Sequence, residues 1–327
     1  MNPTVSILVP NFNHARYLPK RLDTIFAQTY RDFEVIALDD RSSDDSRQVL
    51  QNYAAKAPLR LLFNEENSGS PFIQWQRGAM AATGKYLWIA ESDDYAAPAF
   101  LERLVPILDA RPEVGLVYCQ SSQVSAAGEV GESCEVWNRS LHPTRWTADY
   151  QNSGKDEIAR YMVVYNTIPN ASAVLCRRDV LLNAVQGSIN RRLSGDWWTW
   201  IHMLLQSDIA FVSERLNYFR VHSQSVRATT RLAAACAEDF SLQAYVCENL
   251  PIAWPDRARA FRASYAKWHR SVRSPQQGRD RVWSKRVRSD AVKVYPPGLM
   301  RMAASSFKVS AEQFFRMLVQ KGPTHEQ

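Results

Sequence analysis

Cysteine is scarce in this sequence, and its spacings do not suit cysteine chemistry. The number of cysteines is odd and no Cys-x-x-Cys pair occurs, which argues against a disulfide framework and against a zinc site. We therefore expect reduced thiols in a cytoplasmic protein. The five cysteines are Cys119, Cys134, Cys176, Cys236 and Cys247.

Long apolar runs are also missing. No stretch reaches the 18 or so apolar residues of a membrane-spanning helix. The segment from Met1 to Pro10 runs directly into a strand-like sequence and lacks the basic and apolar regions of a signal peptide. These absences agree with the cytoplasmic location that the cysteines suggest.

The glycine-rich motifs that hold phosphates are absent as well. No GxGxxG follows the first apolar run, and no GxxxxGK[ST] occurs anywhere. The dinucleotide fingerprint and the P-loop are therefore excluded, although carboxylates with a metal could still hold a nucleotide. The 327 residues are 46% hydrophobic and 22% charged, which suits a folded chain of about two domains.

Strand-like and helix-like segments alternate over the first third of the chain. This alternation predicts βαβ units and an α/β fold with a mostly parallel central sheet. The predicted strands are residues 4–10, 33–38, 59–63, 86–90 and 114–119, and the predicted helices are 15–28, 43–57, 71–82 and 98–110. Farther along we predict irregular structure over 121–153, a strand at 173–176, a helix at 197–205, a strand pair at 209–220 and helices after about 230.

Polar residues follow four of these predicted strands. They are Pro10 to Asn13, Asp39-Asp40, Asn64 to Gly69, and Glu91 to Asp94. Ligands bind at the carboxyl ends of parallel strands, so we expect these clusters to converge on one edge of the sheet.

Three carboxylates stand within four residues at Glu91, Asp93 and Asp94. They repel one another unless a cation or donor offsets them, and Mg²⁺ or Mn²⁺ binds such groups together with phosphate oxygens. The alternative is an acidic, solvated turn before a helix. Asp39-Asp40 also has two interpretations: a polar turn before a helix, or a site that recognises a base or ribose through charge-assisted hydrogen bonds. Phe12 is either a core residue or a stacking surface for a base.

Two long segments resemble family 2 glycosyltransferases. They are VPNFNHARYLPKRLDTIFAQTYRDFEVIALDDRSSDDS and ENSGSPFIQWQRGAMAATGKYLWIAESDDYAAP, and the resemblance covers about residues 4–120. It implies a Rossmann-like GT-A fold and an inverting transfer. We expect a glycosyltransferase domain at 1–225, with a donor half at 1–120 and an acceptor half at 121–225, followed by a helical basic region at 226–327.

The resemblance also implies a set of site residues. Glu91 departs from the family's first Asp of the Asp-x-Asp-Asp motif, although its longer side chain can still reach the ribose. The expected ligands of a Mg²⁺ or Mn²⁺ ion are Asp93, Asp94 and His222. The expected nucleotide-sugar site consists of Pro10, Phe12, Asn13, Asp40, Asn67, Gly69, Glu91 and Asp93.

The catalytic base implied by the resemblance is Asp196, which follows Ser194-Gly195 at the start of a predicted helix. A direct displacement needs one base to accept the acceptor's proton. The alternative role for Asp196 is a simple helix N-cap. Trp197, Trp198 and Trp200 could form an acceptor platform, but Trp197 and Trp200 lie on one helix face, so at least one is expected in the core.

These features lead us to expect a metal-dependent hexosyl- or deoxyhexosyltransferase. Its donor would be a nucleoside-diphosphate-sugar, and its acceptor a hydroxyl of a glycan or lipid-linked oligosaccharide, in cell-surface polysaccharide synthesis. Transfer to a polyprenyl phosphate and a non-catalytic sugar-nucleotide-binding protein remain the alternatives.

The C-terminal segment from Arg257 to Lys321 is strongly basic. It has sixteen Lys and Arg against three acids, a net charge of +13, which leaves −6 for the rest of the chain. Interleaved aromatics such as Trp268 and Trp283 suit an anionic membrane surface. We expect that partner through residues 257–321 and no nucleic acid; a solvated helical face is the alternative.

Overall fold

The structure is a computed structural model that describes residues 2–191, 193–221, 232–273 and 281–298. The chain divides into two compact units, which are described separately. The first contains residues 1–158 and 166–229, and the second contains residues 159–165 and 230–327. The sequence did not suggest that 159–165 groups with the C-terminal helices.

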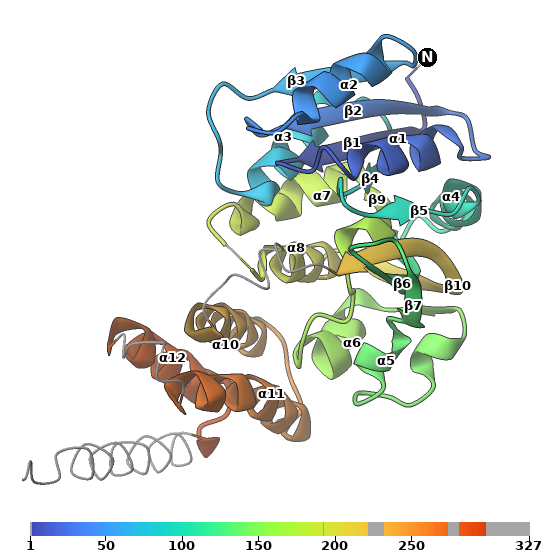
Figure 1. Ribbon diagram of the computed structural model, residues 1–327. Coiled ribbons are helices and arrows are strands. Elements are labelled where there is room, and N and C mark those ends of the chain that lie inside the picture. Colours follow the sequence, from blue (N-terminus) through green and yellow to red (C-terminus); the bar gives the residue numbers. More distant parts are fainter. Residues whose placement is uncertain (1, 192, 222–231, 274–280, 299–327) are drawn as a thin grey trace, which may run out of the picture. The chain divides into compact units, whose positions relative to one another are not determined.

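The first unit is built on one twisted sheet (Figure 1) with the strand order β3-β2-β1-β4-β9-β6-β10-β5. The first four of these strands are parallel, as the βαβ pattern predicts. They are β1 (Val5–Asn11), β2 (Phe33–Asp39), β3 (Leu59–Phe63) and β4 (Tyr86–Ile89).

The second half of the sheet differs from the prediction in two places. β6 runs from Val114 to Ser125, into a segment expected to be irregular, and pairs with β7 (Val130–Ser133). The predicted strand pair at 209–220 is one strand, β10 (Asp208–Val221), because register shifts after Val212 interrupt its apolar pattern without ending it. The remaining strands are β5 (Tyr95–Ala96), β8 (Tyr150–Asn152) and β9 (Val174–Arg177), the last antiparallel to both β4 and β6.

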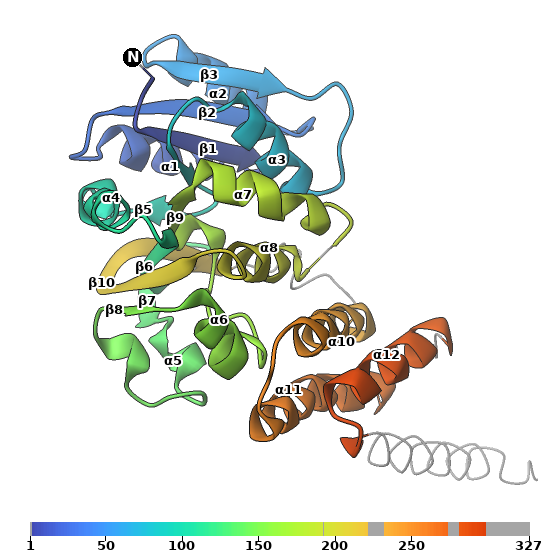
Figure 2. The ribbon, with the colours of Figure 1, turned by 180° about the vertical axis from the view of Figure 1, so that it is seen from behind.

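Helices cover both faces of this sheet. The predicted apolar positions of α1, Leu18, Leu22 and Ile25, are fully buried on the face of β1 that carries Val5, Ile7 and Val9, together with side chains of α2 and α4. α3 packs on the opposite face, where Gly78 lies close to Leu8 and Leu38, and α7 runs beside it (Figure 2). These helices are α1 (Leu18–Phe26), α2 (Ser46–Ala54), α3 (Pro71–Ala81), α4 (Phe100–Ala110) and α7 (Arg178–Val185).

The described part of the first unit also contains α8 (Gly195–Leu204) and several shorter elements. They are α5 (Glu135–Asn138), α6 (Gly154–Glu157) and the single turns η1 (Arg145–Thr147), η3 (Ala171–Ala173) and η4 (Gln186–Ser188). Of η2 (Ile158–Met162), only Ile158 belongs to this unit.

In its described residues, the second unit contains α10 (Leu232–Asn249), α11 (Trp254–Arg273) and α12 (Arg281–Val294) together with residues 159–165. Gln243 ties three of its segments together, since Nε2 donates to the carbonyls of Val164 (3.1 Å) and Ala260 (3.2 Å). Trp268, which the sequence suggested as a surface anchor, is only 3% exposed and belongs to the core of this unit. Within the described ranges, no helix is both long and apolar enough to cross a membrane.

Candidate active site

The carboxyl ends of β1, β2 and β4 meet at one edge of the sheet, as the sequence predicts. Asn11 stands opposite Asp39 in the parallel register of β1 and β2. The amide of Asp40 donates to the carbonyl of Asn11 (2.9 Å), and the amide of Ala90, just after β4, donates to Leu8 (2.7 Å). The polar residues that follow these strands are therefore neighbours in space.

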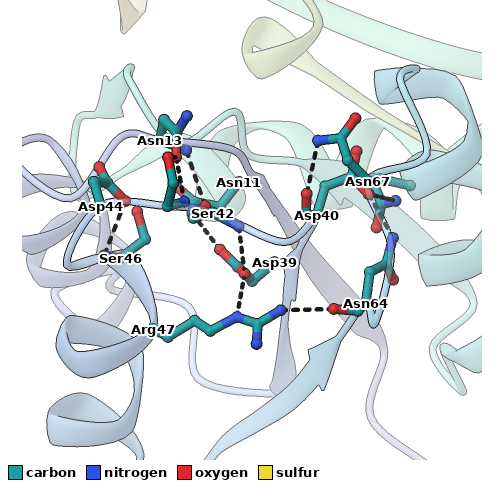
Figure 3. A network of polar contacts seen from close by, with 12 residues as sticks. Asn11, Asn13, Asp39, Asp40, Ser42, Asp44, Ser46, Arg47, Asn64 and Asn67 are labelled. Carbon is teal, nitrogen blue, oxygen red and sulfur yellow. Dashed lines mark hydrogen bonds and ion pairs between the residues drawn. The ribbon is translucent and has the colours of Figure 1, made fainter.

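Asp39 holds this edge together and is fully buried (Figure 3). Its carboxylate accepts hydrogen bonds from Asn11 Nδ2 (2.9 Å) and the amide of Ser42 (3.0 Å), and pairs with Arg47 Nε (2.8 Å). Arg47 also donates to the carbonyl of Asn64 (2.6 Å), at the end of β3. The carboxylate of Asp39 is thus bound by protein donors and has a structural role at this edge.

Asp40 collects the loop after β3 around one carboxylate. Its Oδ1 accepts from Asn64 Nδ2 (2.5 Å), the amide of Ser68 (2.8 Å) and Gln74 Nε2 (3.0 Å). Among the described residues, its Oδ2 accepts from Ser68 Oγ alone (2.8 Å), so Oδ2 is less fully occupied than Oδ1. Asn67 donates to the carbonyl of Asp40 (2.8 Å), so the structure brings these two predicted site residues together.

Two turns beside Asp40 have left-handed backbone. Gly69 has φ +70°, and its amide donates to Asn67 Oδ1 (2.8 Å). Asn13 has φ +57°, a conformation that asparagine tolerates better than most residues, and its Oδ1 accepts from the amide of Ser43 (2.7 Å). Both predicted site residues shape loops around the strand ends.

Phe12 is exposed, which excludes the core interpretation and leaves the stacking surface as a prediction. Its side chain is 47% accessible at the end of β1, while the preceding Pro10 is buried within the strand. An exposed aromatic ring at a strand end can stack on a planar ligand.

Glu91, Asp93 and Asp94 surround a buried cation that the sequence did not reveal, Arg21 of α1. Its Nε donates to the carbonyl of Glu91 (2.9 Å), and its guanidinium lies 5.1 Å from the ring centre of Trp88. Burial lowers the pKa of Arg21 to about 10, against the opposing influence of the three carboxylates.

The carboxylates respond to the same crowding. Burial, followed by repulsion from Asp93, raises the pKa of Glu91 to about 8 and that of Asp94 to about 7. The neighbouring guanidinium of Arg21 therefore does not offset the burial and mutual repulsion of these carboxylates. A hard divalent cation would supply the missing positive charge, so the donor chemistry fits Mg²⁺ or Mn²⁺.

The three predicted metal ligands have different surroundings. Asp94 is buried, and Oδ1 accepts from the amide of Arg220 (2.8 Å). Asp93 is half-buried, and its carbonyl accepts from Arg220 Nε (2.7 Å). His222 lies outside the described residues. Across the part of the chain that the structure describes, no three acidic, His or Cys side chains form a ready metal cage.

Asp196 lies inside the first turn of α8 and is not its N-cap, because that helix begins at Gly195. Its Oδ2 accepts from Asn166 Nδ2 (3.0 Å), and its Oδ1 accepts from the amide of Trp197 (2.7 Å). The carboxylate is half-buried and held at both oxygens, which suits a group that must keep a fixed orientation.

The tryptophans after Asp196 have separate roles. Trp197 and Trp200 are both buried, so they belong to the core and do not form an acceptor platform. Trp198 is half-buried between the guanidinium of Arg191, 3.6 Å from its ring centre, and the stacked ring of His202 at 4.4 Å. For Trp198, a role in binding the acceptor stays a prediction.

Comparison with known proteins identifies the domain that carries this edge. Residues 6–154 match the family model described as glycosyl transferase family 2. Residues 6–154 belong to glycosyltransferase family 2. The family 2 domain is 32% identical over 117 residues to an uncharacterised glycosyltransferase of Nostoc sp., with 35% of each protein covered, so the chain spans about a third of that relative.

A second relative matches a longer part of the chain. Glycosyltransferase GlyG of Streptococcus pneumoniae is 25% identical over 237 residues, which cover 70% of this chain and 74% of GlyG.

The fold of the family 2 domain is GT-A. A crystal structure of Staphylococcus aureus TarS residues 1–349 matches 97% of this chain and 92% of its own length, with a TM-score of 0.68 at 16% identity. Mannosyltransferase PcManGT from Pyrobaculum calidifontis, solved with GDP-Man and Mn²⁺, covers 98% of this chain and 81% of its own, with a TM-score of 0.54 at 16% identity.

The site geometry predicts different effects for Phe12 and Asp40. Phe12→Ala should weaken the binding of a free nucleoside diphosphate by about tenfold, the scale of a lost stacking contact, without changing the melting temperature. Asp40→Ala should weaken binding and also lower the melting temperature, because it leaves the donors of Asn64, Ser68 and Gln74 without their acceptor. Isothermal calorimetry with thermal unfolding measures both, and unchanged affinity in both variants would place the nucleoside elsewhere.

Proposed function

We propose that this protein is an inverting glycosyltransferase that moves a hexosyl or deoxyhexosyl group from a nucleoside-diphosphate-sugar to a hydroxyl of a glycan or lipid-linked oligosaccharide. The observation that carries this proposal is the crowded carboxylate cluster Glu91, Asp93 and Asp94, adjacent to Asp40 and Phe12 in a family 2 domain. A neighbour in fold, TarS, was solved with UDP-GlcNAc, and PcManGT with GDP-Man, which supports the donor class.

In this proposal, residues after different strands bind different parts of the donor. The base stacks on Phe12 and donates to Asp40 Oδ2, and Asp93 faces the diphosphate. A divalent metal held by Asp93, with Asp94 beside it, would neutralise charge on the leaving diphosphate. Glu91 offers a carboxylate oxygen to a hydroxyl of the donor.

The acceptor side depends on Asp196. The acceptor oxygen attacks the anomeric carbon, the bond from that carbon to the diphosphate oxygen breaks, and the hydroxyl proton passes to the Asp196 carboxylate. Attack opposite the leaving group inverts the anomeric centre. The bonds from Asn166 and the Trp197 amide keep the carboxylate oriented for this proton transfer.

Two alternatives predict different behaviour. Transfer to a polyprenyl phosphate needs little base assistance, so loss of Asp196 would be tolerated. A non-catalytic binding protein would bind the donor without turnover. The variants below separate these possibilities.

Metal dependence is the first test. We expect transfer or donor hydrolysis to require Mg²⁺ or Mn²⁺ and to stop in excess chelator. Asp93→Ala should remove most activity while the melting temperature stays close to wild type, because Asp93 lies at a strand end outside the core. Asp109→Ala, which removes an exposed carboxylate paired with Lys85, is the matched control and should keep full activity. Full activity of the wild type in chelator would refute the metal's role.

Loss of the base is the second test. Asp196→Asn keeps the size of the side chain but cannot accept the proton, so turnover should fall by roughly 10²–10⁴ while donor affinity stays near wild type. Asp179→Asn changes an exposed acid in the first turn of α7 and serves as the control. Steady-state kinetics with a glycan acceptor measure both variants. Equal turnover by Asp196→Asn would favour a phosphate acceptor or another base.

Attachment to an anionic membrane is the third test, and we propose it for the second unit. Among the side chains that the structure describes on α11 and α12, four arginines are exposed, and each cation near an anionic surface contributes on the order of 1 kcal/mol at best. The protein should sediment with phosphatidylserine vesicles at low salt and leave them at high salt. Replacing the four arginines by Glu should abolish sedimentation; they are Arg262, Arg270, Arg286 and Arg288.

The control for this experiment carries the same charge change on the first unit. It replaces four of that unit's exposed cations by Glu: Lys56, Arg111, Lys155 and Arg215. This variant should sediment like the wild type. No sedimentation of the wild type at low salt would mean that the basic segment is a solvated helical face.

A further inference from the structure

Glu91 is fixed at several atoms by the protein around it. Its Oε1 accepts a hydrogen bond from Trp75 Nε1 (2.9 Å), its amide donates to Ser172 Oγ (3.2 Å), and its carbonyl accepts from Arg21 Nε (2.9 Å). Among the residues that the structure describes, no hydrogen-bond donor contacts Oε2. Glu91 is only half-buried, so one oxygen is held and the other is left for a ligand.

Trp75 is a rigid donor for this bond. It is 3% exposed on α3, and its ring packs between Phe72, at 5.0 Å between ring centres, and Trp200 of α8, at 5.7 Å. Phe72 in turn lies so close to Gly195 that a side-chain carbon there would come within 2.3 Å of the ring. The same face of α3 therefore supports the first turn of α8, where Asp196 lies.

The residue before Trp75 performs a parallel task. Gln74 Nε2 donates to Asp40 Oδ1 (3.0 Å), so consecutive side chains of α3 hold carboxylates that follow two different strands. Glu91 needs such a restraint because Asp93 repels it and because a Glu side chain has three rotatable bonds to restrict. Without a fixed donor its carboxylate would move away from Asp93.

We propose that Trp75 is a positioning residue of the donor site: its indole N–H fixes Glu91 so that Oε2 faces a hydroxyl of the sugar nucleotide, and its ring supports the helix turn that carries Asp196. The inference rests on the proposed function and deepens it, because it assigns donor affinity to a residue that does not touch the donor.

The direct test is Trp75→Phe, which keeps an aromatic ring against Phe72 and Trp200 but removes the N–H. Donor affinity, measured by calorimetry and as KM, should weaken about tenfold, the scale of a lost hydrogen bond to a charged group, while turnover at saturating donor stays near wild type. Trp75→Leu also removes the ring beside α8 and should lower turnover as well. Trp75→His restores a ring N–H and should recover part of the donor affinity that Trp75→Phe loses.

The matched control is Trp146→Phe. Trp146 is also 3% exposed, and its Nε1 donates to Tyr118 OH (2.7 Å), a bond that the phenylalanine variant would lose. Trp146 does not hydrogen-bond to Glu91. Its donor affinity should equal that of the wild type. Thermal unfolding of each variant verifies that it is folded at the assay temperature.

A double-mutant cycle with Glu91→Ala separates positioning from general packing. If Trp75 acts through Glu91, Trp75→Phe has no further effect on donor affinity once Glu91 is alanine. Unchanged affinity of Trp75→Phe, or an equal loss in both backgrounds, would overturn the assignment. A wild-type protein that binds no nucleotide sugar would instead refute the proposed function itself.

Discussion

The site depends on one electrostatic constraint: three carboxylates after β4 are crowded around the fully buried guanidinium of Arg21, with the buried Arg220 bound to the backbone carbonyl of Asp93. Burial and mutual repulsion raise the pKa values of Glu91 and Asp94 towards neutrality, although Arg21, Trp75 and the Arg220 amide each favour the ionised forms. Near neutral pH these two carboxyl groups therefore retain protons to a large extent unless another cation is present. A divalent cation would lower these pKa values again, so the arrangement that crowds the acids also prepares the place where a diphosphate and its metal would bind.

The two parts of the edge are prepared differently. Around Asp39 and Asp40 nearly every acceptor position is filled by a protein donor, and the loop from Asn64 to Gly69 is fixed before any ligand arrives. Such preorganisation limits the entropy lost when a nucleoside binds. After β4, Glu91 Oε2 receives no hydrogen bond from the described residues. A rigid polar edge beside a crowded carboxylate cluster would suit the proposed donor, which has a neutral base and a charged diphosphate.

Much of this edge could be predicted because parallel strands bring their carboxyl ends together whatever the details of packing. Asp40 and Asn67 illustrate this: local patterns place each after its strand, and the fold joins them. Arg21, Trp75 and Arg220 could not be found in that way, since each acts on a partner 16 or more residues away and none stands in a motif. Trp268 failed for a related reason: an aromatic residue between cations can face either solvent or core, and only helix packing decides between them. The register shifts in β10 similarly interrupt its apolar pattern, so that the sequence predicts two strands where the structure has one.

The arrangement of α3 explains how the two parts keep a fixed separation. β1 lies between β2 and β4, so the residues that follow β2 and β4 are about two strand spacings, or roughly 10 Å, apart. Gln74 and Trp75 bridge that separation from one helix, the former to Asp40 and the latter to Glu91. Strand pairing alone fixes the backbone but leaves both side chains free to rotate. Because adjacent residues of one helix restrain both carboxylates, a displacement of α3 would move the carboxylates of Asp40 and Glu91 together. The spacing of these two carboxylates is therefore set by a helix on the far side of the sheet from α1.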